Sequence, residues 1–445
     1  MSTVSHNSQK LEAVSTEVST PPKPTKRPSH HAFSSLNHAN FRLFWFGQLI
    51  SLIGTWMQTT AQSWLVLELT GSAWLLGVVG ALQFLPVMLM ALFGGVIADR
   101  FPKRRILLFT QSFAMLQAAV LWALVATGKT QIWQVMVLAL LLGCTNALDM
   151  PTRQAFVSEM VGRKDLPNAI ALNSSLFNMA RIVGPGIGGL LIARLGIAPL
   201  FLMNAISFIA VLIGLILINP KKLFATSKPL ALANGEPKPT MLQSIREGLS
   251  YAMHTPSISL IIIIVGTISL IGINFNVILP LFATDVLHSG AEGFGFISSA
   301  FGLGSLFCAL WLAWGNRRPN MRSLLIGTIV FSILEACFAL SHWYVVSLVL
   351  IASVGCAQIA FSATANTTIQ TVAPDHLRGR VMSLYMLVFA GSIPLGNLLT
   401  GGMAHLLGSP LTLLIEAGIC LITAIIGWIL RKPAEKNLAE TLRIQ

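Results

Sequence analysis

Long apolar runs follow one another along the chain, separated by short polar connections. Each run has about 20 residues or more, which is enough for a helix to cross the hydrocarbon core of a bilayer. Membrane-spanning strands are shorter and alternate in polarity, so continuous runs of this length predict helices. We therefore expect an all-α integral membrane protein with twelve transmembrane helices, at about 42–66, 75–98, 105–127, 131–149, 169–193, 198–218, 257–284, 293–314, 323–341, 344–366, 380–406 and 410–430.

The basic residues are concentrated in every second connection. Of the 29 lysines and arginines, 26 lie in these connections or at the termini, and the other three are Lys129, Arg181 and Arg194. Positively charged loops stay on the cytoplasmic side, so the pattern predicts that both termini are cytoplasmic. The net charge of +13 does not indicate nucleic-acid binding, because no segment outside the apolar runs is large enough to form a basic domain. With only 10% charged residues, the partner that covers most of the surface is the lipid bilayer.

One long connection divides the apolar runs into six and six. The two groups repeat each other at an offset of about 212 positions, where 195–196 matches 407–408, and of about 218, where 116–119 matches 334–337. This predicts two pseudo-symmetric six-helix halves. We expect a disordered N-terminal tail at 1–40, a first bundle at 41–219, a cytoplasmic linker at 220–255, a second bundle at 256–431 and a cytoplasmic C-terminal tail at 432–445.

Polar residues form a stripe along the first apolar run. Ser51, Thr55, Gln58, Thr59 and Gln62 recur at three- and four-residue steps, so they share one face of a helix. Uncharged polar groups in hydrocarbon cost free energy unless they have partners. The stripe either lines a central aqueous cavity, which its length favours, or hydrogen-bonds to neighbouring helices.

The fifth apolar run combines an arginine with glycines and a proline, in the series Asn178, Arg181, Gly184, Pro185, Gly188 and Gly189. Glycines let a neighbouring backbone approach closely, and proline leaves a carbonyl without its donor, so this helix is suited to bending, to sliding at an interface or to tight packing. An arginine inside a span is costly and faces protein or water. Three roles stay open for it: binding an anionic substrate, pairing with an acid, or reaching to the cytoplasmic surface.

Two acids lie inside apolar runs. Glu335 and Glu416 belong to the ninth and twelfth runs, and the repeat matches them with Gln117 and Asn204. Two carboxyls in a low-dielectric interior cannot both ionise cheaply, so one holds a proton at neutral pH. The pair is either a hydrogen bond between helices or the site of a coupling proton, and Glu68 at the border of the first run is a further candidate.

The second connection carries a basic motif. Residues 95–105 read Gly-Val-Ile-Ala-Asp-Arg-Phe-Pro-Lys-Arg-Arg, with one acid and four cations in what we expect to be a loop. This order resembles the motif between helices 2 and 3 of the major facilitator superfamily, although Pro102 stands where that motif usually has glycine. The Gly-Pro-x-x-Gly-Gly series of the fifth run resembles the antiporter motif of the same superfamily. The chain therefore resembles a secondary transporter.

The resemblance implies a latch that holds the two halves together on the cytoplasmic side. In it, Asp99 binds arginines at the start of the eleventh helix and favours the outward-open state, and Arg104 or Arg105 braces it against Asp149. The basic residues also fix topology, but a topology signal alone does not require the acid. The expected latch comprises Gly95, Asp99, Arg100, Arg104, Arg105, Asp149, Arg378 and Arg380.

The superfamily also places helices 1, 4, 7 and 10 around the substrate pathway. Many of its proton antiporters carry an arginine inside helix 4, but residues 138–142 before Gly143 contain none, so that coupling mechanism does not carry over. The expected pathway combines the polar residues of these four helices with two from helix 5: Thr55, Gln58, Gln62, Asn146, Asn178, Arg181, Asn274, Asn276, Gln358 and Asn366.

Two further stretches, Gly-Thr-Trp-Met-Gln at 54–58 and Asp-Met-Pro-Thr-Arg-Gln at 149–154, resemble the bacterial exporter branch that includes the enterobactin exporter and macrolide efflux proteins. This implies proton-driven export of an amphipathic drug or siderophore by a monomer in the bacterial cytoplasmic membrane. An importer or facilitator of a small metabolite, and a membrane sensor that does not transport, are the alternatives. The sequence contains no Gly-x-x-x-x-Gly-Lys-Ser/Thr, catalytic triad or metal cluster, so we expect neither an enzyme nor a cofactor.

Overall fold

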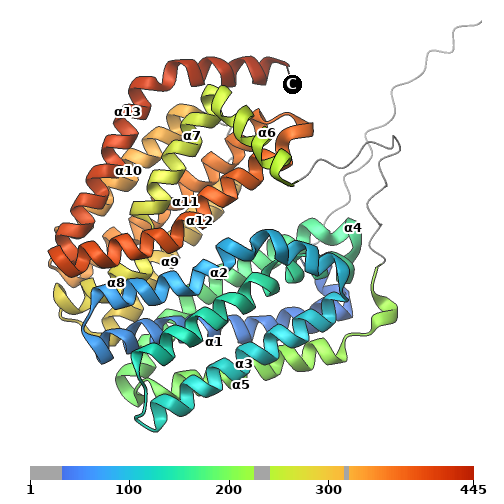
Figure 1. Ribbon diagram of the computed structural model, residues 1–445, viewed down its shortest axis with the longest axis vertical. Coiled ribbons are helices and arrows are strands. Elements are labelled where there is room, and N and C mark those ends of the chain that lie inside the picture. Colours follow the sequence, from blue (N-terminus) through green and yellow to red (C-terminus); the bar gives the residue numbers. More distant parts are fainter. Residues whose placement is uncertain (1–32, 225–240, 315–319, 445) are drawn as a thin grey trace, which may run out of the picture.

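The computed structural model describes residues 33–224, 241–314 and 320–444. Side chains of residues 91–100, 241–246, 313, 375–376 and 442–444 are outside this description, as are most of the expected N-terminal tail and the centre of the expected linker. The described chain consists of helices joined by short turns and contains no strand (Figure 1). The expectation of an all-α protein is confirmed.

The first half of the described chain contains five long helices. A glycine in the left-handed region ends the first of them: Gly71 has φ 58°, and its N–H bonds to the carbonyl of Leu67. The fourth helix is 64 residues long and is interrupted at Gly162, where φ is 70° and ψ is 177°. The chain turns back at this point, so the two parts of the helix each pass through the bundle once. The helices are α1 (Ala39–Thr70), α2 (Ala73–Arg100), α3 (Lys103–Ala126), α4 (Ile132–Leu195) and α5 (Ala198–Leu217).

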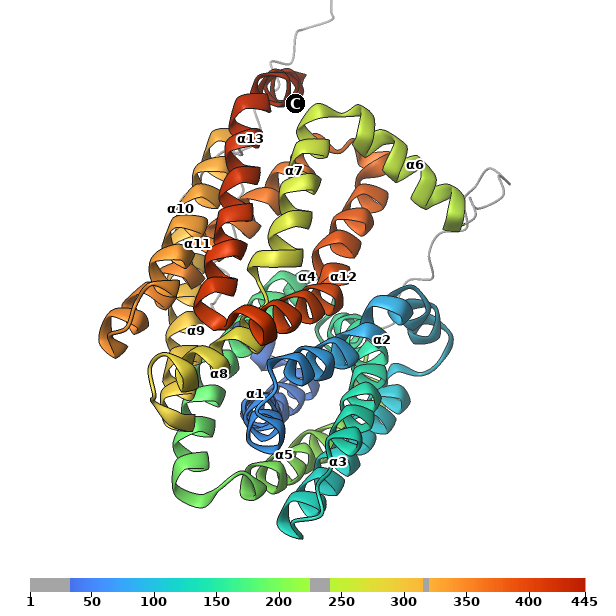
Figure 2. The ribbon, with the colours of Figure 1, turned by 60° about the vertical axis from the view of Figure 1, so that its left-hand side comes forward.

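The second half begins with a short helix that packs beside α12 and continues through a broken helix (Figure 2). We expected one continuous helix at about 257–284, but a π-helical turn, η3 (Ile268–Gly272), and non-helical residues 273–274 divide it. The helices are α6 (Met241–His254), α7 (Pro256–Thr267), α8 (Phe275–Asp285), α9 (Gly290–Trp314), α10 (Met321–Ala339), α11 (Tyr344–Val372), α12 (Asp375–Leu407) and α13 (Ser409–Ile444).

Twelve membrane crossings follow from these helices. In the described residues, ten helices are long and apolar enough to cross a membrane, if α7, η3 and α8 are counted as one. One of the ten, α4, crosses twice, on either side of Gly162. The polar helix α1 adds the last crossing, because its 32 residues exceed the length that a bilayer requires.

The described residues near both ends of the chain are helical, although disorder was expected for the whole of residues 1–40. Residues 33–40, assigned to a disordered tail from sequence, include the 3-10 turn η1 (Ser34–Asn37) and the start of α1. The turn is held to α4, since Ser34 donates to Asp165 and Ser35 donates to Asn168, and His38 also pairs with Asp165. The hydrogen bonds from His38 and Ser34 keep the pKa of the Asp165 carboxyl below its usual range. At the other terminus, α13 continues as a helix through residue 444.

We call the end of the molecule that holds η1 and the last turns of α13 the terminal end, and the other the opposite end. At the terminal end of the first half, Lys103 pairs with Glu159, and Asn40 bonds to the backbone of Asn219. At the terminal end of the second half, Arg322 pairs with Glu435. The turns after α1, α3 and α12 lie at the opposite end.

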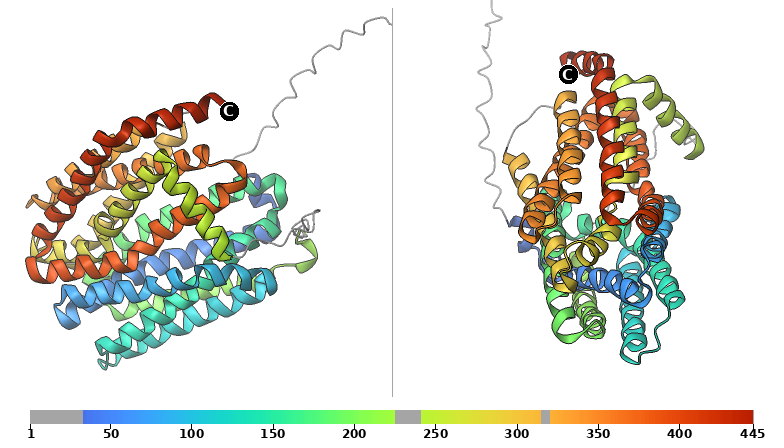
Figure 3. Two further views of the ribbon diagram at one scale, coloured as in Figure 1. Left: turned by 45° about the horizontal axis from the view of Figure 1, so that its top comes forward. Right: turned by 90° about the vertical axis from the view of Figure 1, so that its left-hand side faces the viewer.

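The halves meet mainly through two helix pairs, α4 with α9 and α2 with α12. Figures 1 and 3 show the two halves as stacked layers whose helices run close together at the opposite end and diverge toward the terminal end. Both pairs cross at glycines near the opposite end: a methyl group at Gly189 would lie 2.8 Å from Cα of Gly295, and one at Gly401 would lie 2.8 Å from Cα of Gly77. Because such short distances leave no room for a side chain, the crossings need glycine.

Candidate functional site

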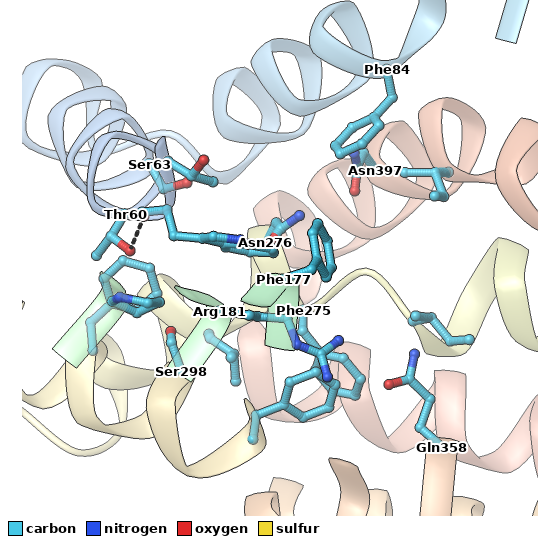
Figure 4. A pocket seen from close by; sticks show the side chains of 18 of the residues that line it. Thr60, Ser63, Phe84, Phe177, Arg181, Phe275, Asn276, Ser298, Gln358 and Asn397 are labelled. Atoms are coloured by element: carbon cyan, nitrogen blue, oxygen red, sulfur yellow. Dashed lines mark hydrogen bonds between the residues drawn. The ribbon is translucent and has the colours of Figure 1, made fainter. Parts of the chain in front are cut away.

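A cavity of about 340 Å³ lies between the halves, and residues from both halves line it (Figure 4). The first half contributes α1, α2 and the second part of α4, and the second half contributes η3, α8, α9, α11 and α12. Clefts of this size that are mostly apolar and hold a few polar groups are typical small-molecule sites. The lining residues form three sets, which are aromatic, polar and aliphatic.

Aromatic rings form a large part of the wall. Trp56 meets Phe177 edge to face with 5.6 Å between ring centroids, and Phe275 meets Phe301 at 4.7 Å. Such contacts between rings stabilise their positions in addition to the stabilisation that comes from burying apolar surface. The sequence-based prediction did not include the phenylalanines, because a phenylalanine in an apolar span looks the same whether it faces lipid or a cavity. The seven aromatic lining residues are Trp56, Phe84, Phe177, Phe275, Phe294, Phe301 and Phe389.

The break between η3 and α8 places two of the lining residues. The Asn274 side chain donates to the carbonyls of Leu270 and Ile271, so it supplies hydrogen bonds to carbonyls at the end of the interrupted helix. The helix resumes at Phe275, and both Phe275 and Asn276 line the cavity. Breaks of this kind are frequent at functional sites, because they aim side chains away from the regular helical face.

Arg181 carries the charge of the cavity. Its guanidinium donates to Asn178 at 3.3 Å and lies 5.9 Å from the ring centroid of Phe301. Its Nε is buried and has no hydrogen-bond partner among the described residues. Figure 4 shows Arg181 and Gln358 projecting into the same space from different helices. Arg181 therefore reaches the cavity, so of the three roles that the sequence left open, its position favours contact with a substrate.

Three more buried polar atoms on the wall have no partner in the described part of the chain. They are Oγ of Ser269, Oε1 of Gln358 and Nδ2 of Asn397. Buried polar groups normally find a partner, so these atoms are available to a ligand or to water. Asn397 was not among the residues expected from the sequence. A search for single amides in the later apolar runs would have found it.

Three of the ten expected pathway residues line this cavity: Arg181, Asn276 and Gln358. Asn178 supports Arg181 from one turn away. Thr55 donates to the carbonyl of Ser51 in its own helix.

The other pathway candidates, on α4, on α11 and in the break before α8, are not among the residues that line the cavity. Asn146 is half-buried on the first part of α4 and is not among the lining residues. Asn274 packs against Gly396 of α12, and Asn366 accepts a hydrogen bond from Gln370 toward the terminal end of α11.

Gln58 and Gln62 do not line this cavity, which corrects their assignment to the pathway. Gln58 is buried and donates to Gln117 at 2.9 Å while it accepts from Asn204 at 2.7 Å, so it links α1, α3 and α5. Gln62 is also buried and donates to Gln83 of α2 at 3.4 Å. For these two residues the second interpretation of the stripe, hydrogen bonding between helices, describes the structure.

The basic motif is mostly helical instead of forming a loop. The backbone of residues 95–100 belongs to α2, and α3 begins at Lys103, so the turn between them is only 101–102. The side chains of Gly95, Asp99 and Arg100 lie outside the described residues, and the latch contact of Asp99 stays a hypothesis. Pro102 starts α3 as its N-cap.

The proposed brace between the motif and Asp149 is absent from the described contacts. Arg104 donates to the carbonyls of Leu215 and Ile216, where it caps the end of α5, and Arg105 is exposed. Asp149 is buried and instead pairs with Arg153, and it accepts from Thr110 and Gln111. A buried carboxylate requires such close partners, and Thr110, Gln111 and Arg153 supply them.

The arginines of the second half have partners within that half. Arg378 donates to the carbonyl of Gln370, and Arg380 pairs with Glu247 of α6. These contacts hold α6, α11 and α12 together at the terminal end.

The glycine series of α4 contacts two different helices. Gly184 and Gly188 pack against α1, at Trp56 and Met57, whereas Gly189 faces α9 across the boundary between the halves. Pro185 lines the cavity, and its carbonyl lies 2.5 Å from where a methyl group on Gly295 would be. The segment from 184 to 189 therefore joins the cavity to the contact between the halves.

Glu335 and Glu416 lie inside the second half, away from the cavity wall. Glu335 is fully buried, and neither of its carboxyl oxygens has a partner among the described residues. Glu416 is 3% exposed and accepts a hydrogen bond from Thr400 of α12. Glu68, the third proton-coupling candidate, is exposed in a separate pocket at the opposite end, so its position does not support a role inside the membrane.

Comparison with known proteins agrees with this architecture. A family model described as transmembrane secretion effector matches residues 30–443. The chain is 28% identical over 404 residues to the multidrug efflux pump Tap of Mycolicibacterium fortuitum, covering 89% of this chain and 97% of Tap. It is 27% identical over 377 residues to the staphyloferrin A transporter of Staphylococcus aureus, covering 82% of this chain and 90% of the transporter.

The exporter branch suggested by the sequence also appears among the relatives. The enterobactin exporter EntS of Shigella boydii is 24% identical over 377 residues, covering 83% of this chain and 86% of EntS. A crystal structure of the nucleoside transporter NupG superposes with a TM-score of 0.70 at 15% identity, covering 88% of this chain and 99% of NupG. At that identity the likeness shows a common fold.

Proposed function

The chain belongs to the transmembrane secretion effector family of the major facilitator superfamily, a family of membrane transporters and not of enzymes, and from this premise we propose that it exports an amphipathic small molecule by alternating access. The observation that carries the proposal is the cavity between the halves, together with the two glycine crossings beside it. A cavity that both halves build changes its access when the halves rock against each other.

The distribution of charge supports the direction of access. The described parts of the basic connections, together with η1 and the last turns of α13, lie at the terminal end, and positively charged loops stay in the cytoplasm. The arrangement described here, with the halves in contact at the opposite end, is then an inward-facing state that receives substrate from the cytoplasm. The outward-facing state would separate Gly189 from Gly295 and bring the terminal ends together, with Asp99, Arg378 and Arg380 in the latch.

The names of the relatives support export of a drug or a siderophore. Tap is a multidrug efflux pump and EntS is an enterobactin exporter. The test is whole-cell efflux of a fluorescent drug from bacteria that express the chain, with and without a protonophore. An exporter lowers accumulation, and the protonophore abolishes this effect. A facilitator is insensitive to the protonophore, an importer raises accumulation, and a sensor changes nothing.

We assign the coupling proton to the pair Glu335 and Glu416. Their burial supports this, because two ionised carboxyls in a low-dielectric interior repel each other and one proton relieves the repulsion. The hydrogen bond from Thr400 joins the pair to α12. On that helix Gly401 forms a glycine crossing and Asn397 lines the cavity. A change of protonation at Glu416 therefore acts on the helix that contacts both the substrate and the other half.

The coupling assignment is tested in proteoliposomes. Glu335→Gln and Glu416→Gln should each abolish uptake driven by an imposed pH gradient while substrate exchange without a gradient continues. Glu68→Gln, at the exposed end of α1, is the matched control and should leave both activities unchanged. Gradient-driven transport that persists in Glu335→Gln would rule the pair out.

A further inference from the structure

The described wall of the cavity is mostly apolar in area, and its polar side chains are uncharged except for one. Of its twenty described lining residues, seven are aromatic, and Arg181 is the one with a formal charge. No described carboxylate lines the wall, so a cationic substrate would meet a like charge without a compensating acid. The electrostatics of the cavity therefore distinguish between substrates by the sign of their charge.

The contacts of Arg181 leave its charge available. Its described contacts are the neutral amide of Asn178 and the ring of Phe301, and its Nε–H is buried without a partner. A guanidinium over an aromatic face still presents its N–H edge, which is the edge that binds carboxylates. A buried cation with an unpaired donor is costly unless an anion completes it.

The internal repeat argues against a purely structural role for this arginine. At the offset of 212 positions, Arg181 corresponds to Ile393 of α12, and both residues line the cavity. In the second half, the equivalent position thus holds the aliphatic side chain of Ile393. The fold itself does not need a cation there, so the charge is a feature of the cavity.

We propose that the substrate is an aromatic anion whose acidic group binds Arg181 and whose ring system lies among the phenylalanines. The proposal rests on the export function proposed above and specifies its substrate class. Gln358 and Asn397, which have unpaired polar atoms on the same wall, add hydrogen bonds to polar groups elsewhere on the substrate. The volume of about 340 Å³ matches a ligand of modest size.

Binding of three probes with one aromatic body tests the proposal. We would measure the affinity of the purified full-length protein for 4-biphenylacetate, the neutral 4-biphenylacetamide and the cationic 4-(aminomethyl)biphenyl by equilibrium dialysis, with protein-free micelles as blank. The carboxylate should bind about tenfold or more tightly than the amide, since a charge-assisted hydrogen bond is the difference. The ammonium should bind most weakly.

Variants of Arg181 assign the preference to that residue. Arg181→Gln should weaken binding of the carboxylate about tenfold to a hundredfold and leave the amide within about twofold. Arg181→Lys keeps the charge and should keep part of the preference. The matched control is Arg194→Gln, since Arg194 is exposed at the end of the same helix. Thermal unfolding of each variant checks that it is folded.

Three results would overturn the proposal: no binding of the carboxylate, equal or tighter binding of the amide or the ammonium, or unchanged carboxylate affinity in a folded Arg181→Gln. Efflux measured on the same variants separates this proposal from the export function. If Arg181→Gln exports an anionic aromatic fluorophore as well as the wild type does, in a protonophore-sensitive way, the anion site is wrong and the exporter stands. If the wild type binds the carboxylate with the expected preference and exports nothing, the anion site stands and the exporter is wrong.

Discussion

Gly189 of α4 and Gly295 of α9 each occupy the space that a side chain on the other would need. A methyl group on either residue would lie 2.8 Å from Cα of its partner. Gly77 and Gly401 form the same contact between α2 and α12, and the residues correspond by the repeat, since Gly295 follows Gly77 by 218 positions and Gly401 follows Gly189 by 212. Duplication therefore produced two equivalent crossings that join the halves at one end.

Gly189→Ala should weaken closure at the opposite end. The added methyl group would meet backbone atoms, Ala291 O at 2.5 Å and Gly295 Cα at 2.8 Å, which cannot move without separating the helices. Overpacking of this kind costs about 1–3 kcal/mol, and here the cost falls on the closed arrangement alone. We expect the distance between spin labels at the exposed positions Arg194 and Asp285 to increase and efflux to fall.

A matched control for this change is Gly418→Ala on α13, where an added methyl group has no neighbour within 4 Å. It should leave both the label distance and efflux unchanged. Gly77→Ala at the repeat-related crossing should reproduce the effect of Gly189→Ala. If the label distance in Gly189→Ala equals that of the wild type, the crossing does not control closure.

Thr400→Val should uncouple transport from protons. Valine has nearly the shape of threonine but cannot donate the hydrogen bond that Glu416 accepts. Without the bond, protonation of Glu416 no longer acts directly on α12, and the buried carboxyl loses a donor at a cost of about 1–3 kcal/mol. The measurement is the pH dependence of substrate exchange in proteoliposomes, which should become flatter.

The control for this prediction is Thr423→Val on α13, since the Thr423 hydroxyl donates only within its own helix, to Ile419 at 2.9 Å. That variant should keep the wild-type pH profile. A role of Thr400 in packing alone predicts lower stability with an unchanged profile, and such a result would remove Thr400 from the coupling mechanism.

Gln58→Ala should destabilise the first half without changing substrate preference. The substitution breaks the hydrogen bonds to Gln117 and Asn204 and leaves these buried amides partly unpaired, which costs about 1–3 kcal/mol of unfolding free energy. Thermal unfolding and probe binding measure the two effects separately. Thr59→Ala is the comparison, because Thr59 lines the cavity and bonds only within α1, so it should change binding more than stability. A change of probe preference in Gln58→Ala would return that residue to the pathway.

The contrast between Gln58 and Thr59 shows what periodicity can predict. Helical spacing grouped the polar residues of α1 into one stripe, because uncharged polar side chains in a span need partners or water. Spacing does not predict which neighbour each side chain of the stripe contacts, since that depends on how the surrounding helices are packed. Thr59 faces the cavity, whereas Gln58 faces α3 and α5.

The spans were predictable because their length and composition are set by the bilayer, which every crossing must satisfy. The break at η3 was not predicted, because Ile268–Gly272 has the same apolar composition as a regular helix, and Gly272 and Asn274 are weak local signals. The aromatic wall was missed for a similar reason. Phe84 lines the cavity and Phe307 is 69% exposed, yet both are phenylalanines in apolar runs.

A single fixed cation at Arg181 also has an electrical consequence. An anion that leaves a cell moves negative charge outward, and a membrane potential that is negative inside favours this by about 2.3 kcal/mol for each charge at 100 mV. A proton that enters in exchange moves charge in the same electrical sense and gains as much again. The sign of one side chain would thus make export of its substrate electrogenic, so that the voltage across the membrane drives each cycle together with the pH gradient.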